Sequence, residues 1–231
     1  MRAIFVHGSC VRDGAWWWSR VASILRADGV PSAAVELPSC GEGDGRPGTD
    51  GPGLDADVEQ LRRLLAQGGP AVVVGHSYGG VVATEAVRAG DAEHLIYISS
   101  FLPAVGESLA SFGGPEPAPF LDFTPDGTFG ARPEQLRELF LQDCDGEAVD
   151  GAFARLTRQS AAAVAQPVGN AGWQHTPSTY LVCAQDRATP PAVQRAQAAR
   201  AGRVIELPAG HHPMLSRPQL VADAVLATFN V

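Results

Sequence analysis

The sequence contains no lysine, so arginine supplies all 17 of its basic side chains. This absence excludes enzymes that form a Schiff base on a lysine or use a lysine as the general base. It also excludes the phosphate-binding loop of nucleotide hydrolases, whose motif requires a lysine before serine or threonine. Any chemistry must therefore rest on other side chains.

Positive charge and long apolar runs are also scarce. The formal net charge is -8, which argues against a nucleic-acid partner and weakly against an anionic membrane surface. No apolar run approaches the roughly 20 residues that span a bilayer. The segment Met1–Val6 runs directly into a loop, so we expect no signal peptide and a cytoplasmic protein.

Cysteines are few and are not grouped for metal binding. None of the four forms a Cys-x-x-Cys pair or a zinc-like cluster with histidine, so we expect free thiols and no metal. A glycine-rich stretch at residues 41–45 lacks the spacing of a dinucleotide loop, so we expect no cofactor. The four cysteines are Cys10, Cys40, Cys144 and Cys183.

Short apolar runs alternate with helical stretches along most of the chain. This alternation predicts one α/β domain over residues 1–231, with about six strands in a mainly parallel sheet and helices on both faces. The expected strands are Ala3–Val6, Ser32–Leu37, Ala71–Val74, Leu95–Ile98, Thr179–Cys183 and Arg203–Leu207. The expected helices are Ala15–Arg26, Leu54–Ala66, Val81–Ala89, Pro191–Ala201 and Pro218–Phe229.

The alternation stops between residues 103 and 176. This region begins with many proline, glycine and phenylalanine residues and continues with two helical patterns, Arg132–Asp143 and Gly151–Ala165. We interpret it as an inserted, mainly helical cap. Its phenylalanines either line an apolar pocket or form the core of the cap itself; they are Phe112, Phe120, Phe123, Phe129, Phe140 and Phe153.

One candidate nucleophile, Ser77, lies in the sequence Gly75-His76-Ser77-Tyr78-Gly79. A Gly-x-Ser-x-Gly motif alone is weak, but here a buried strand precedes it and a helix follows it. That context predicts a strand–turn–helix in which the serine projects above the sheet. The turn is so tight that side chains at Gly75 and Gly79 would collide with neighbouring chain.

A serine hydroxyl requires a base and an acid that orients it. His211 and His212 both follow the last expected strand, and Asp186 follows the strand before it, so all can meet Ser77 at the carboxyl ends of the strands. The other histidines do not have this topology. Weaker candidates for the acid lie in the cap: Asp122, Asp126, Asp143 and Asp145.

An acyl-transfer site also requires two backbone N–H groups for the developing oxyanion. Tyr78, directly after the nucleophile, is expected to supply one. The loop after the first strand is expected to supply the other, from Ser9 or alternatively from Cys10.

Together these residues resemble the α/β-hydrolase superfamily, and more narrowly the branch of plant methylesterases and hydroxynitrile lyases. The order Ser77, Asp186, His211 is the serine–acid–histidine order of this fold. In the family the catalytic histidine stands five residues before a position like Ser216, so the resemblance selects His211 over His212. His212 then fills a neighbouring variable position. The matching segments are residues 5–8, 14–18, 75–80, 180–183 with Asp186, and 211–218.

The resemblance favours an esterase over a lyase. The similar lyases carry a threonine at the place of Gly8 and a lysine after the catalytic histidine, where this chain has His212. About two extra residues between His7 and Trp16 lengthen the oxyanion loop relative to the plant pattern. The residues expected to contact substrate are Gly8, Cys10, Phe101, Phe120, Phe123 and His212.

We therefore expect a serine hydrolase acting through a Ser-His-Asp triad and an acyl-enzyme on an ester, lactone or thioester of a small, largely apolar molecule. Two alternatives stay open. One is a non-hydrolytic enzyme on the same fold, such as a lyase, cyclase or acyltransferase, and the other is a ligand receptor with slow turnover. A homodimer is also left open.

Overall fold

The structure is a computed structural model that describes residues 1–114 and 116–229. Its centre is a six-stranded sheet, all parallel, in the order β2-β1-β3-β4-β8-β9. The predicted sheet is therefore confirmed, strand for strand. The strands are β1 Arg2–Val6, β2 Ser32–Ala34, β3 Ala71–His76, β4 His94–Ile98, β8 Ser178–Cys183 and β9 Arg203–Leu207.

Helices cover both faces of the sheet, as expected. On one face α2 (Ser19–Ala27), α9 (Pro213–Ser216) and α10 (Pro218–Leu226) pack on strand residues such as Phe5 and Ile96. On the other face α3 (Leu54–Ala66), α4 (Tyr78–Ala86) and α8 (Pro191–Ala198) pack on residues such as Ile4 and Tyr97. Alternate strand residues thus enter two separate cores, which explains why the central strands β1, β3 and β4 are mostly apolar.

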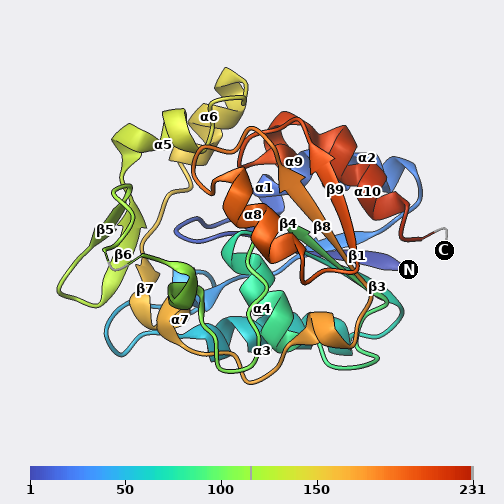
Figure 1. The fold of residues 1–231 in the computed structure, drawn as a ribbon, viewed down its shortest axis with the longest axis horizontal. Coiled ribbons are helices and arrows are strands. Elements are labelled where there is room, and N and C mark those ends of the chain that lie inside the picture. The colour runs from blue at the N-terminus through green and yellow to red at the C-terminus, as the bar shows by residue number, and fades with distance from the viewer. Residues whose placement is uncertain (115, 230–231) are drawn as a thin grey trace.

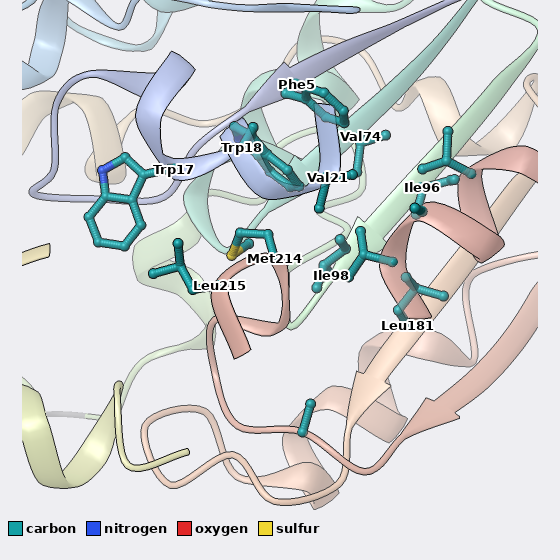
Figure 2. Packing of buried hydrophobic residues seen from close by; sticks show 14 of the residues in the cluster. Phe5, Trp17, Trp18, Val21, Val74, Ile96, Ile98, Leu181, Met214 and Leu215 are labelled. Atoms are coloured by element: carbon teal, nitrogen blue, oxygen red, sulfur yellow. The ribbon is translucent and has the colours of Figure 1, made fainter. Parts of the chain in front are cut away.

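The segment expected to form one helix over Ala15–Arg26 is divided in two. Residues Gly14–Trp17 form α1, and α2 begins after Trp18, whose backbone (φ -98, ψ 0) departs from helical values. The Trp18 ring stacks on Phe5 with centroids 4.5 Å apart, inside the first core (Figure 2). This burial of tryptophan against the first strand fixes how the first helices lie on the sheet.

The chain between β4 and β8 contains more strand than we expected. Three short strands form a separate antiparallel sheet in the order β5-β6-β7: Leu121–Phe123, Thr128–Ala131 and Gln159–Ser160. The helices and 3₁₀ turns of this insertion are η2 Leu109–Phe112, α5 Pro133–Leu139, α6 Gly146–Phe153, α7 Ala161–Ala165 and η3 Gly172–Gln174. Figure 1 shows β5, β6 and α5 on the side of the molecule opposite the two chain ends.

Several predicted boundaries were wrong. The expected helix Gly151–Ala165 does not form, because α6 ends at Phe153 and the chain then extends into β7 before α7. The expected helix Val81–Ala89 begins earlier, at Tyr78, and ends at Ala86. Strand β2 stops at Ala34, and a 3₁₀ turn, η1 (Pro38–Cys40), opens the following loop. Among the described residues, no helix has the length and apolar character needed to cross a membrane.

Candidate active site

Ser77 lies on a strained turn between β3 and α4. Its backbone (φ 51, ψ -121) is in a region that non-glycine residues rarely occupy, and its carbonyl accepts a hydrogen bond of 2.6 Å from Ser100 Oγ. A Cβ added to Gly75 would stand 2.6 Å from Gly80 Cα, and one added to Gly79 would overlap the carbonyl oxygen of Val6. The collisions expected from the motif are therefore present, and the glycines let the strained turn persist.

His211 and Asp186 form a buried pair close to this turn. The Nδ1–H of His211 donates to Asp186 Oδ2 at 2.8 Å; the carboxylate can only accept, which assigns the proton to Nδ1. In the neutral ring the lone pair is therefore on Nε2, and both His211 and Ser77 line the same cavity. Within the described chain, Ser77 Oγ has no hydrogen bond to His211; catalytic contacts of this kind often tighten only when substrate binds.

Asp186 is held as an ionised carboxylate by many donors. Burial acts to raise its pKa, but the neighbouring His211 and several hydrogen bonds bring the pKa below its ordinary value. Its Oδ1 accepts from the backbone N–H groups of Ala188 (2.8 Å) and Thr189 (3.0 Å), and its Oδ2 accepts from Gln194 Nε2 (2.8 Å). A carboxylate fixed in this way can keep the ring of His211 in one orientation.

Ser99 is a member of this group that the sequence did not reveal. Its hydroxyl donates to Asp186 Oδ2 and lies 3.1 Å from Nδ1 of His211. Ser99 follows β4 with a positive φ of 43, so it too stands at the carboxyl end of a strand. The strand before Ser99 lies in the sheet between the strands that precede Ser77 and Asp186. That position was the one indication in the sequence that Ser99 belongs to the site, because no motif marks this residue.

His76 and His212 flank His211 rather than replace it. The Nε2–H of His76 donates to the carbonyl of His211 at 2.9 Å, and the Nδ1–H of His212 donates to the carbonyl of Phe140 at 3.1 Å. Burial and the proximity of His211 lower the pKa of His212 to about 3 and hold that of His76 well below its ordinary value. Both flanking rings are therefore neutral near pH 7, and neither contacts a carboxylate among the described residues.

The loop after β1 places Gly8 against Ser77 and Ser9 in the cavity. A Cβ added to Gly8 would stand 3.1 Å from Ser77 Cβ, so a larger residue would crowd Ser77. The backbone N–H of Cys10 donates to Gln159 Oε1 at 3.2 Å. That N–H is already satisfied, whereas Ser9 next to it lines the cavity.

A buried carboxylate, Asp57 in the first turn of α3, connects both sides of this region. It accepts from Tyr78 Oη (2.6 Å) and from Ser39 Oγ (2.5 Å) and N (2.9 Å). Ser39 Oγ in turn accepts from Gln159 Nε2 at 3.0 Å, and Gln159 accepts from Cys10. This chain of hydrogen bonds, which we call the Asp57 network, joins Tyr78 to the loop after β1.

The site opens into a cavity of about 540 Å³ whose lining is mostly apolar. All six residues expected to contact substrate line it: Gly8, Cys10, Phe101, Phe120, Phe123 and His212. Of the six phenylalanines that we expected either to line a pocket or to form the core of the cap, five line the cavity. Phe153 instead packs against the first core. Trp17 also lines the cavity.

The weaker acid candidates lie elsewhere. Asp122 pairs with Arg158 at 3.1 Å, and Asp145 pairs with Arg20 at 2.6 Å. Asp126 accepts from the threonines around it, and Asp143 accepts from the backbone N–H of Gly210 at 2.8 Å. In these contacts none of the four bonds the ring of His211.

A parallel sheet followed by a serine on a glycine turn, with a histidine–carboxylate pair beyond the last strands, defines an α/β hydrolase. The family model described as "Alpha/beta hydrolase family" matches residues 3–224. The chain belongs to this family.

Curated relatives cover most of the chain. It is 30% identical over 213 residues to the alpha/beta hydrolase nvfD of Aspergillus novofumigatus, covering 84% of this chain and 83% of that protein. It is 27% identical over 257 residues to methylesterase 1 of Arabidopsis thaliana, covering 96% and 94%. Among solved structures, a pyrethroid hydrolase from Sphingobium faniae superposes with a TM-score of 0.87 at 25% identity, covering 100% of this chain and 98% of that one.

Proposed function

We propose that this chain is a serine hydrolase that cleaves a carboxylic ester, lactone or thioester of a small, largely apolar molecule through an acyl-enzyme. Ser77 attacks the carbonyl, His211 takes its proton, and Asp186 orients His211. The observation that carries this proposal is the buried His211–Asp186 hydrogen bond of 2.8 Å, in a cavity that Ser77 also lines.

In this proposal the backbone N–H groups of Ser9 and Tyr78 stabilise the oxyanion. Each such donor is worth about 3 kcal/mol in comparable sites. Ser9 is preferred over Cys10 because the N–H of Cys10 is used by Gln159. The Tyr78 N–H is the first of α4, where the helix dipole also favours negative charge.

The substrate class is supported by the shape and chemistry of the cavity. Phe101, Phe120 and Phe123 line it, and its volume suits a molecule of modest size. The names of the relatives, a methylesterase and a pyrethroid hydrolase, are consistent with ester substrates. The bound molecule would replace water around Ser77 with apolar surface, which strengthens the oxyanion contacts.

A fluorophosphonate label followed by peptide mapping tests the nucleophile. We expect the label on Ser77, and Ser77→Ala should lower turnover of p-nitrophenyl acetate by on the order of 10⁶. Exposed Ser19, whose hydroxyl donates to the carbonyl of Trp16, provides the control substitution Ser19→Ala. Label on another residue, or esterase activity unchanged in Ser77→Ala, would remove the assignment.

The same assay separates hydrolysis from the two alternatives. Repeated turnover excludes a receptor, which would release at most one equivalent of p-nitrophenol. Products that require an added alcohol or amine would indicate an acyltransferase. A screen of esters and lactones of increasing acyl size then identifies what fills the cavity.

A further inference from the structure

Three histidines surround the candidate site, and catalysis as proposed uses only one of them. The rings of His76, His211 and His212 form a triangle with centroids 4.8, 4.8 and 4.9 Å apart. Each can offer one ring nitrogen, and these three nitrogens all lie within 4.8 Å of one another. We propose that this cluster binds a divalent transition-metal ion of the Zn²⁺ type, and that the bound ion inhibits the enzyme.

The hydrogen bonds of the three rings resemble those of metal-binding histidines. Such histidines almost always donate their other ring N–H to a carboxylate or a backbone carbonyl, which fixes the tautomer and the ring orientation. Here His211 donates to Asp186, His76 to the carbonyl of His211, and His212 to the carbonyl of Phe140. Every ring is thus left with one nitrogen whose lone pair is unused.

The geometry requires only a small contraction. Zinc binds imidazole nitrogen at about 2.0–2.1 Å, so tetrahedral ligands stand roughly 3.4 Å apart. Three nitrogens that already lie within 4.8 Å of one another can reach that spacing by ring movements of about 1 Å. Three histidine ligands also leave a fourth position open for water or another ligand.

The ion has a route into the cluster. All three histidines line the cavity of about 540 Å³ that also contains Ser77. The net charge of -8 favours cations near the protein, although it does not select the site. Imidazole ligands suit zinc, copper and nickel better than magnesium or calcium, so the selectivity follows from the ligand type.

Inhibition follows from the shared ligand and rests on the proposed function. The only lone pair that His211 can give the metal is on Nε2, because Nδ1 donates to Asp186. That lone pair is the one that would accept the proton of Ser77. Metal binding and the proton transfer are therefore mutually exclusive, whereas binding itself does not depend on any catalytic activity.

Direct binding is measured on the full chain carrying Ser77→Ala. Zinc chloride is titrated into this variant by calorimetry in a buffer that does not chelate metal, near pH 7.5. We expect one equivalent to bind with a Kd in the micromolar range or tighter. Cobalt(II) in place of zinc should give the visible absorption of a four-coordinate site.

The ligand assignment is tested with His212→Asn in the same background. Asparagine can still donate to the carbonyl of Phe140 but has no imidazole nitrogen. We expect at least a tenfold weaker Kd, with the thermal midpoint showing that the variant folds. His175→Ala is the control, because His175 directly follows η3, lies beside the carbonyl of Val87 and is not among the residues that line the cavity, so it should leave the zinc affinity unchanged.

The activity arm uses the chain with Ser77 intact. Zinc should inhibit p-nitrophenyl acetate turnover, and a chelator should reverse the inhibition. His212→Asn should raise the inhibition constant for zinc at least tenfold, whatever the turnover rate of this variant without zinc. Absence of zinc binding to the Ser77→Ala protein, or equal affinity in His212→Asn, overturns the site. Zinc binding by a chain without esterase activity would keep the site and overturn the proposed function alone.

Discussion

The hydroxyl of Tyr78 is expected to stabilise the protein through one buried carboxylate. Tyr78 is fully buried, and its Oη donates to Asp57 Oδ2 at 2.6 Å. A hydrogen bond to a charged group contributes about 1.5–3 kcal/mol, against about 1 kcal/mol between neutral groups. Tyr78→Phe should therefore reduce the free energy of unfolding by about 2 kcal/mol, or lower Tm by ~6 °C for a chain of this size.

Tyr97 provides a matched control. It is equally buried, and its hydroxyl bonds the neutral hydroxyl of Thr84 at 3.0 Å. Tyr97→Phe removes the same atom from a similar environment but leaves no carboxylate without its donor. Its expected cost is about 1 kcal/mol, or ~3 °C in Tm.

The pH dependence gives a sharper test of the same reasoning. Burial raises the pKa of Asp57 above its ordinary value, although the hydrogen bonds from Ser39 and Tyr78 act to lower it. The folded state thus binds this proton more tightly than the unfolded chain, and the contribution of Asp57 to stability falls as pH rises above the ordinary pKa. Removing the Tyr78 hydroxyl raises the folded pKa further, so the cost of Tyr78→Phe should not be smaller at pH 8 than at pH 5.

Urea unfolding followed by tryptophan fluorescence at the two pH values measures this difference. The reasoning is refuted if Tyr78→Phe costs no more than Tyr97→Phe at pH 8. It is also refuted if the cost of Tyr78→Phe is larger at pH 5 than at pH 8. Either result would mean that Asp57 does not carry a charge that the Tyr78 hydroxyl stabilises.

Two further substitutions examine the elements around Ser77. Ser99→Ala removes one of the donors to Asp186. It should lower kcat for p-nitrophenyl acetate by roughly 10- to 100-fold, with a smaller change in KM. An unchanged kcat would show that Ser99 does not position the pair of His211 and Asp186. Gly75→Ala places a Cβ 2.6 Å from Gly80 Cα. We therefore expect loss of fluorophosphonate labelling and a Tm lowered by more than ~5 °C. The control is Gly146→Ala, which should change neither, because a Cβ there would meet nothing within 4 Å. Labelling at the normal rate in Gly75→Ala would contradict the account of the turn.

The sheet and the turn could be predicted because their signals are local. The strand before Gly75 is apolar throughout, and a serine between glycines follows it at once, so order along the chain was enough. The helix Leu54–Ala66 was predicted to the residue, since its apolar spacing is regular and a glycine pair follows it. The topological rule that places loops at the carboxyl ends of parallel strands then brought Asp186 and His211 to the same edge.

The rest depends on contacts between distant segments, which no local pattern records. Ser99 stands 87 residues from Asp186, and Asp57 and Gln159 had no motif that singled them out. The sequence around Gln159 was assigned to a helix because its alanines favour one, but pairing with β6 holds it as a strand. Tertiary hydrogen bonding there overrides local propensity.

The Asp57 network has a consequence for how such an enzyme can change over evolutionary time. Gln159 belongs to the segment between β4 and β8, which supplies much of the cavity lining, yet its side chain also holds Cys10 beside Ser9. Neighbouring backbone bonds, from Thr157 N to the carbonyl of Cys10 and from Arg12 N to that of Arg155, strengthen this attachment. A lineage that remodels the segment between β4 and β8 to admit a new molecule therefore also moves the loop after β1, which carries Gly8 and Ser9. Changes in the shape of the cavity and changes in that loop will therefore tend to occur together.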